Sequence, residues 1–181
     1  MPGIARRPAY MQKWRRYLLP SGAAAGLVLL VVLSWRLPCL VVSGADGRPL
    51  LRFALWPDKQ FTLTYVHSVQ KTPCYENLEP GPDGDLVLTS TEYESLGVGL
   101  PFLVGEGKLI NRDGRFILTG LNRHFTEIDL RAMPVAQQAL IVRGHRFDLS
   151  NTFAPGSLLR LKVKPVTLFQ IFREKLCQGE D

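Results

Sequence analysis

The chain has 181 residues, of which 46% are hydrophobic and 21% are charged, so it is long enough for one ordinary domain and is not disordered throughout. Its net charge of +6 comes from the first 36 residues, which hold six of the 22 basic side chains and no acidic one. The rest of the chain carries 16 basic and 16 acidic side chains and is formally neutral. Because nucleic-acid binding needs basic charge on the folded domain, we expect no nucleic-acid partner.

Residues 17–35 form an uncharged apolar run that follows a basic N-terminus, residues 1–16. As a helix this run would be about 28 Å long, close to the hydrocarbon thickness of a membrane. Lys13, Arg15 and Arg16 precede it, and basic residues mark the cytoplasmic end of a membrane helix. We therefore expect one transmembrane signal anchor in the lipid bilayer, with the N-terminus cytoplasmic and the C-terminal domain extracytoplasmic.

A cleaved signal peptide is the main alternative, because it shares the basic start and the apolar stretch. Trp35, Arg36 and Pro38 stand where a signal peptidase needs small residues. The sequence therefore favours an uncleaved anchor.

Beyond residue 38 the pattern changes to short apolar-alternating runs separated by Gly, Asp, Asn and Pro, which is typical of an all-β domain. Seven or eight strands over residues 39–165 predict a β-sandwich or a small barrel, and the pattern does not separate these two. The candidate strands are Leu40–Ser43, Pro49–Leu55, Phe61–Ser68, Asp85–Ser95, Arg115–Leu121, Phe125–Arg131, Ala139–Arg143 and Leu158–Lys164.

Two of these strands alternate clearly enough to assign faces, since strand side chains repeat every two residues. The last strand gives a basic outer face of Arg160, Lys162 and Lys164. The side chains predicted to face the core are Phe61, Leu63, Tyr65, Leu159, Leu161 and Val163.

The C-terminal segment, residues 166–181, is predicted to form a short helix and a tail. One side of that helix is apolar and carries Leu168, Phe169, Phe172 and Leu176. This side packs on the core of the domain or touches the bilayer surface or a membrane partner, and the sequence leaves both alternatives open.

The three cysteines are Cys39, Cys74 and Cys177. In an oxidising compartment a Cys74–Cys177 disulfide and three unpaired thiols are both compatible with this odd count. Their spacing matches no metal site.

No motif in the sequence points to catalysis. His67 and Ser68 are neighbours on a predicted strand and so point to opposite faces, which argues against a catalytic pair. The chain also lacks a nucleophile elbow, a glycine-rich phosphate loop and a zinc-protease helix. We expect no enzyme activity, no metal and no cofactor.

Two polar stretches nevertheless stand out, one after the strand that starts at Phe61 and one around Glu92. We expect His67, Lys71 and Glu76 to form one cluster at a strand end, near the loop Gly97–Pro101. This cluster is either a structural network or a binding site for a carboxylate or a cation. The candidate binding residues are His67, Ser68, Lys71, Thr72, Glu76, Glu92, Gly97 and Gly99.

The same two stretches resemble the signatures of a domain-of-unknown-function family, DUF1850. They are His67-Ser68-Val69-Gln70-Lys71-Thr72-Pro73 followed by Glu76, and Ser95-Leu96-Gly97-Val98-Gly99-Leu100-Pro101. The similarity continues through Asp113-Gly114, Arg123 and Arg146–Leu149 and covers roughly residues 39–165.

This resemblance implies a class of partner and no reaction. Family members are small exported or singly anchored bacterial proteins associated with tripartite (TRAP, TAXI-type) transporters. We therefore expect an accessory protein of a tripartite organic acid transporter in the bacterial inner membrane, whose partner is the transporter permease or the solute-binding protein. The alternative is a small-ligand or cation-binding β module.

Overall fold

The computed structural model describes residues 26–94 and 107–171. These residues fall into two compact units, which we describe separately. The larger unit is Leu37–Pro165, and the smaller one contains residues 26–36 and 166–171.

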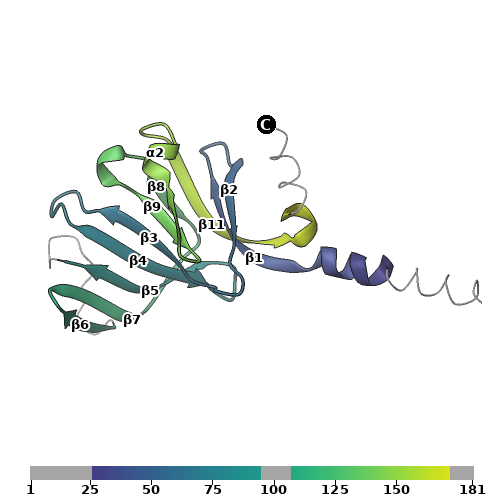
Figure 1. Ribbon diagram of the computed structural model, residues 1–181, viewed down its shortest axis with the longest axis horizontal. Coiled ribbons are helices and arrows are strands. Elements are labelled where there is room, and N and C mark those ends of the chain that lie inside the picture. Colours follow the sequence, from purple (N-terminus) through teal and green to yellow (C-terminus); the bar gives the residue numbers. More distant parts are fainter. Residues whose placement is uncertain (1–25, 95–106, 172–181) are drawn as a thin grey trace, which may run out of the picture. The chain divides into compact units, whose positions relative to one another are not determined.

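The larger unit is built from two β-sheets (Figure 1). One sheet has four strands in the order β2-β1-β11-β8, with β1 pairing antiparallel to β2 and β11 to β8. Its strands are β1 (Arg36–Ser43), β2 (Pro49–Ala54), β8 (Ile128–Arg131) and β11 (Leu158–Thr167).

The other sheet has seven strands in the order β10-β9-β3-β4-β5-β7-β6, and neighbouring strands pair antiparallel. Two short helical turns, η1 (Pro134–Ala136) and α2 (Leu149–Thr152), lie before β9 and after β10. The strands are β3 (Phe61–Val66), β4 (Pro73–Pro80), β5 (Leu86–Tyr93), β6 (Lys108–Arg112), β7 (Arg115–Phe125), β9 (Ala139–Val142) and β10 (His145–Asp148).

The all-β prediction is confirmed, and each of the eight candidate runs overlaps a strand. The described residues contain eleven strands, more than the seven or eight expected. The additional ones are β4, β6 and β10. Each was missed because it lacks a clear apolar alternation or has only four or five residues.

Both sheets contribute side chains to one hydrophobic core. The face assignment is confirmed for Phe61 and Leu63 on β3 and for the three apolar residues of β11, all of which are buried core residues. Tyr65 is half-buried and packs against this core. The core comprises Leu40, Val42, Leu55, Phe61, Leu63, Leu78, Leu86, Leu88, Leu118, Leu121, Ala132, Leu140, Val142, Leu149, Leu159, Leu161 and Val163.

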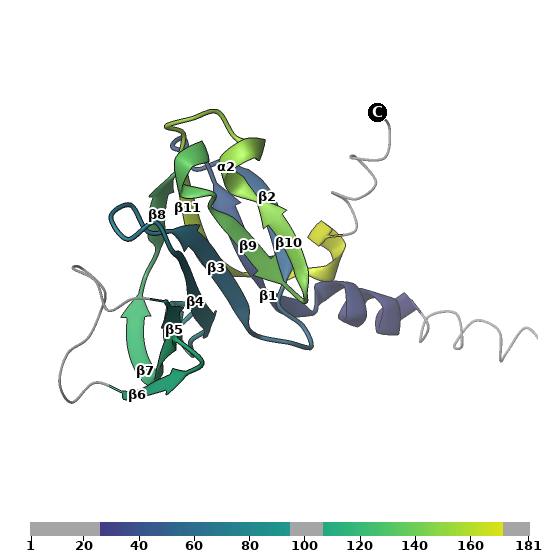
Figure 2. The same cartoon turned by 60° about the vertical axis from the view of Figure 1, so that its left-hand side comes forward.

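An aromatic pair joins the end strands of the two sheets. Phe53 on β2 and Phe147 on β10 have ring centroids 4.5 Å apart, and Figure 2 shows these two strands side by side. Such a tilted pair is a favourable aromatic geometry. It therefore ties the two sheets together at one border.

Two cations of the basic outer face predicted for the last strand are paired with acids from β8 and the residue just before it. Arg160 donates two hydrogen bonds to the Asp129 carboxylate, at 2.7 and 2.8 Å. Lys162 Nζ lies 2.5 Å from Glu127 Oε2. Lys164, the third basic residue of this face, is exposed.

In the smaller unit, residues 26–34 are helical, and the apolar side chains from Leu27 to Val32 are exposed. No helix within residues 26–94 and 107–171 has the length and apolarity needed to cross a membrane. The predicted anchor, residues 17–35, lies partly outside the described residues.

The C-terminal helix starts two residues later than expected. Strand β11 continues through Pro165 to Thr167, and residues 168–171 are helical. The rest of the predicted helix and tail, residues 172–181, lies outside the described residues.

Candidate functional site

Four of the predicted site residues belong to the turn that joins β3 to β4. The His67 N–H donates to the Thr72 carbonyl, and the Lys71 N–H donates to the His67 carbonyl, both at 2.9 Å. Ser68 is exposed within this turn. Lys71 has a φ of +57°, the left-handed conformation that a tight turn needs.

The His67 side chain caps its own turn. Its Nδ1 accepts hydrogen bonds from the N–H groups of Val69 and Gln70, at 3.3 and 3.2 Å. A ring nitrogen that accepts N–H bonds carries no proton, so the neutral ring has its proton on Nε2. The capping role is structural, and it leaves Nε2 as the nitrogen available to another group.

Glu76 and Glu92 do not meet, because they point to opposite faces of the seven-stranded sheet. Glu76 stands opposite Leu63 on one side and Thr91 on the other, and directly opposed residues share a face. Leu63 is a core residue, so Glu76 faces the core. Glu92, next to Thr91, faces the outside.

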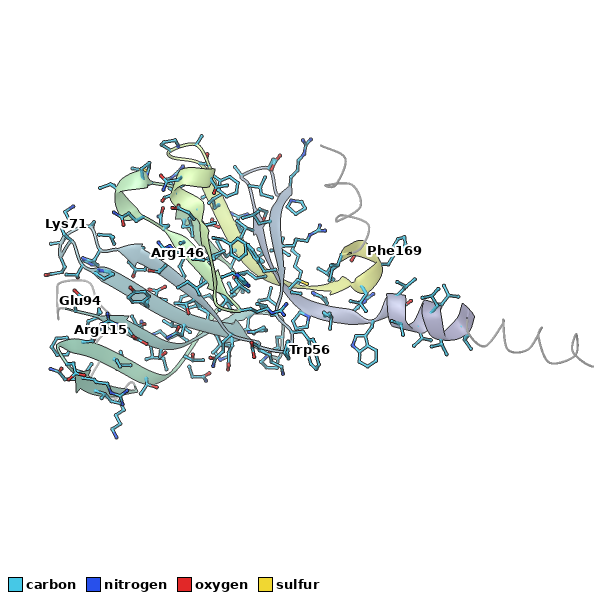
Figure 3. All side chains as sticks on the ribbon, in the orientation of Figure 1. Trp56, Lys71, Glu94, Arg115, Arg146 and Phe169 are labelled. Carbon is cyan, nitrogen blue, oxygen red and sulfur yellow. The ribbon has the colours of Figure 1, made fainter. Side chains whose placement is uncertain are left out.

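The turn that joins β3 to β4 lies at the end of the sheet where β3 and β5 finish. Figure 3 labels Lys71 and Glu94 there. Gly97 and Gly99 lie outside the described residues, as does the loop that contains them. The structure therefore groups the turn residues and separates Glu76 and Glu92 from each other.

The core-facing side of β3, β4 and β5 carries a second set of polar groups, which we call the inner polar cluster. Its central contact is a hydrogen bond of 3.0 Å from the Tyr65 hydroxyl to Glu76 Oε1. The cluster consists of five residues that the strand register brings side by side on this face. Tyr65, Cys74 and Tyr93 stand opposite one another in one row, and Glu76 and Thr91 stand opposite each other in the next row.

Two hydroxyl groups of the inner polar cluster are buried and have no hydrogen-bond partner among the described residues. They belong to Thr91, which is 0% exposed, and Tyr93, which is 1% exposed. The Tyr93 ring stacks on Phe116 with centroids 6.1 Å apart. Buried polar atoms without a partner are rare, so these two hydroxyls mark a position where another polar group would be bound favourably.

The environment of the inner polar cluster opposes negative charge. Burial raises the pKa of Glu76, and the hydrogen bond from Tyr65 and the positive charge of Arg123 offset this rise only in part. Arg123 stands opposite the core residue Leu88, so it also lies on the inner face.

Burial also raises the pKa of each neighbouring acidic hydroxyl or thiol. It does so for Tyr65 and Cys74, where the charge of Glu76 adds to the effect, and for Tyr93. The cluster is therefore a set of neutral donors around one carboxyl group whose charged form is disfavoured.

Cys74 is fully buried beside Tyr65 and Cys39 is also buried, and neither forms a disulfide with another described residue. Cys177, the other member of the predicted disulfide, lies outside the described residues. The pairing stays a prediction.

Chemically, the inner polar cluster is suited to hydrogen bonding. In the described ranges, no three His, Cys, Asp or Glu side chains gather as metal ligands would. Two hydroxyl donors, one carboxyl group and a nearby arginine charge match a small polar or carboxylate-bearing molecule.

Sequence reasoning named Glu76 as a candidate and Tyr65 as inward-facing, but it grouped Glu76 with His67 and Lys71 and did not include Thr91 or Tyr93. The signal was the alternation of β5, where Thr91 and Tyr93 occupy the face opposite Glu92. The candidate chosen from β5 was the acidic residue Glu92, which lies on the outer face and not on the core-facing side of the cluster.

Comparison with protein families agrees with the motifs described above. Residues 61–149 match the family model described as Domain of unknown function (DUF1850). This part of the chain belongs to that family. The DUF1850 segment runs from β3 into α2 and contains the whole inner polar cluster. No curated protein and no solved structure matches the chain.

Proposed function

We propose that this protein is a membrane-anchored, extracytoplasmic accessory protein of a tripartite (TRAP, TAXI-type) organic acid transporter. Its partner in this proposal is the permease or the solute-binding protein of the transporter, in the bacterial inner membrane. The match over residues 61–149 is to the DUF1850 family, and the class of partner is what the resemblance to that family implies. We propose a non-enzymatic role because the sequence offers no constellation that chemistry requires.

The observation that carries membrane anchoring is the exposed apolar surface of the helix 26–34. Six consecutive apolar side chains, from Leu27 to Val32, are between 44% and 64% exposed. A helix that is apolar on all sides needs apolar surroundings on all sides. The uncharged sequence of residues 17–25 extends this run toward the basic N-terminus.

Co-purification from membranes tests the proposed partner. The full chain, tagged at its C-terminus, is solubilised in mild detergent and its companions are identified by mass spectrometry. We expect the permease or the solute-binding protein to be retained. Recovery of the tagged chain without either of them, from membranes that contain both, would overturn the proposal.

A second candidate function is the binding of a small carboxylate at the inner polar cluster. The unpartnered hydroxyls of Thr91 and Tyr93 favour it, because a carboxylate would accept from both, and the charge of Arg123 would offset part of the cost of burying its negative charge. Succinate titrated into the purified full chain, followed by calorimetry, is the probe.

The variants Thr91→Val and Tyr93→Phe should each abolish the heat of binding, whereas Thr89→Val, whose hydroxyl already donates to the Asn77 carbonyl, should not. Absence of heat with the wild-type chain would overturn binding of this dicarboxylate. Equal binding by wild type and both cluster variants would place its site elsewhere.

A further inference from the structure

We propose that the helical turn formed by residues 168–171 lies on the bilayer surface, next to Trp35, so that the chain contacts the membrane at two separate segments. This inference rests on the proposed membrane anchor. It names a second lipid contact, close to the C-terminus, that neither the family match nor the anchor implies.

Trp35 and the helical turn are joined inside the smaller unit. The Leu168 N–H donates to the Trp35 carbonyl with a distance of 3.1 Å between nitrogen and oxygen. Trp35 directly follows the last residue of the helix 26–34. The turn therefore begins beside the point where the proposed anchor ends.

A capping box fixes the start of the turn. The Thr167 N–H donates to Gln170 Oε1 at 3.0 Å, and the Gln170 N–H donates to Thr167 Oγ1 at 3.3 Å. This reciprocal pair is the arrangement that begins a helix with its first N–H groups satisfied. It holds Phe169 in a defined place, two residues after the capping threonine.

The aromatic side chains of this region are exposed. Trp35 is 64% exposed and Phe169 is 56% exposed, and Figure 3 shows Phe169 projecting from the helical turn. Trp is enriched at membrane–water interfaces, and large apolar side chains such as Phe gain free energy on leaving water. Both side chains are therefore better placed in lipid than in water.

The position of Trp35 along the chain argues that lipid, rather than a protein partner, covers these exposed aromatic side chains. The apolar run ends at Trp35, and the next residue, Arg36, is charged and exposed. A change from apolar residues through an aromatic to a charged residue is the order met where a helix leaves the hydrocarbon core. Since the turn is bonded to Trp35, it reaches the same depth.

Fluorescence quenching by brominated lipid tests the contact. The full chain is placed in nanodiscs of phosphatidylethanolamine and phosphatidylglycerol, with bromine near the glycerol end of the acyl chain. Its three tryptophans, Trp14, Trp35 and Trp56, are replaced by Phe, and one reporter is then introduced at a time. The reporters are Trp35 itself, Phe169→Trp and, as a matched control on β7, Phe125→Trp, where the native side chain is 36% exposed.

We expect Phe169→Trp to be quenched about as strongly as Trp35, and Phe125→Trp to be quenched much less. Adding Thr167→Val should weaken the quenching at position 169, because it removes the cap, whereas Thr167→Ser should preserve it.

The outcomes separate this inference from the function on which it rests. If Trp35 is quenched but Phe169→Trp is quenched no more strongly than Phe125→Trp, the second contact is overturned and the anchor is left intact. An unquenched Trp35 would overturn the anchor and this inference with it.

Discussion

The hydroxyl of Tyr65 donates a hydrogen bond to Glu76 Oε1, 3.0 Å away, on the core-facing side of β3 and β4. A carboxyl group in this position lies among apolar neighbours such as Leu63 and depends on the few polar groups that reach it. The Tyr65 hydroxyl is one such group.

The two tyrosines of the cluster should respond differently to loss of their hydroxyl groups. Tyr65→Phe removes the donor to Glu76 and should lower the free energy of unfolding by about 1–3 kcal/mol. Tyr93→Phe removes a hydroxyl without a protein partner among the described residues, so stability should stay the same or rise. Urea unfolding of the full chain in detergent measures both. A large loss for Tyr93→Phe alone would show that its hydroxyl has a bound partner.

The raised pKa of Glu76 should make stability depend on pH. In the unfolded chain Glu76 titrates near its ordinary value of 4.5, whereas the folded domain holds the proton to higher pH. Below that value both states are protonated and the side chain contributes no pH dependence. Above it the folded state binds more protons, so the free energy of unfolding falls as pH rises toward the folded-state pKa.

Glu76→Gln removes this titration. The variant should gain stability relative to wild type as pH is raised from 4.5 toward neutrality. Thermal unfolding at a series of pH values gives the comparison. Parallel pH profiles of stability for the two proteins would contradict a raised pKa of Glu76 in the folded domain.

Replacement of Leu161 by Ala tests the core that both sheets share. Leu161 is 0% exposed on β11, so Leu161→Ala removes buried methyl groups and leaves a cavity. The expected loss in unfolding free energy is about 2–5 kcal/mol. Lys164→Ala, an exposed position on the same strand, is the control. A change for Leu161→Ala below about 0.5 kcal/mol, the range of surface substitutions, would show that β11 is assigned to the wrong face.

Replacement of Gly107 and of Gly114 by Ala should distinguish the stability cost of backbone strain from that of a steric clash. Both glycines have positive φ, +71° and +82°. A Cβ at Gly107 would lie 2.5 Å from the Thr119 carbonyl oxygen, whereas one at Gly114 would meet nothing within 4 Å. Replacement by Ala at either position should cost about 1–3 kcal/mol of backbone strain, and only Gly107→Ala carries the clash in addition. Equal losses, measured by urea unfolding, would mean that the Thr119 backbone moves aside freely.

The sequence was sufficient to predict the β class and the inward faces of β3 and β11, because Phe61, Leu63, Leu159 and Leu161 alternate with polar residues. It was insufficient for β4, whose inward positions include Cys74 and Glu76. A charged residue on the inner face removes the alternation that identifies a half-buried strand.

The candidate site could be predicted only in part, because the sequence does not determine how the strands pair. The local motif grouped His67 with Lys71 correctly, since both lie in one short turn. Whether Glu76 and Glu92 share a face depends on the register of β3, β4 and β5, and register is a property of the folded sheet. The unpartnered hydroxyls of Thr91 and Tyr93 depend on tertiary packing for the same reason.

The contact between Phe53 and Phe147 also bears on how the domain avoids aggregation. It ties together β2 and β10, the end strands at one border of the two sheets, where an unprotected strand would be a template for pairing with another chain. At the opposite end of each sheet, β8 has only four residues and is braced by the Asp129–Arg160 ion pair, and β6 has five residues with Lys108 and Arg112 at its ends. Short and charged end strands are poor templates. Copies of this domain are therefore expected to stay separate at high concentration, without strand-to-strand association through the described part of either sheet.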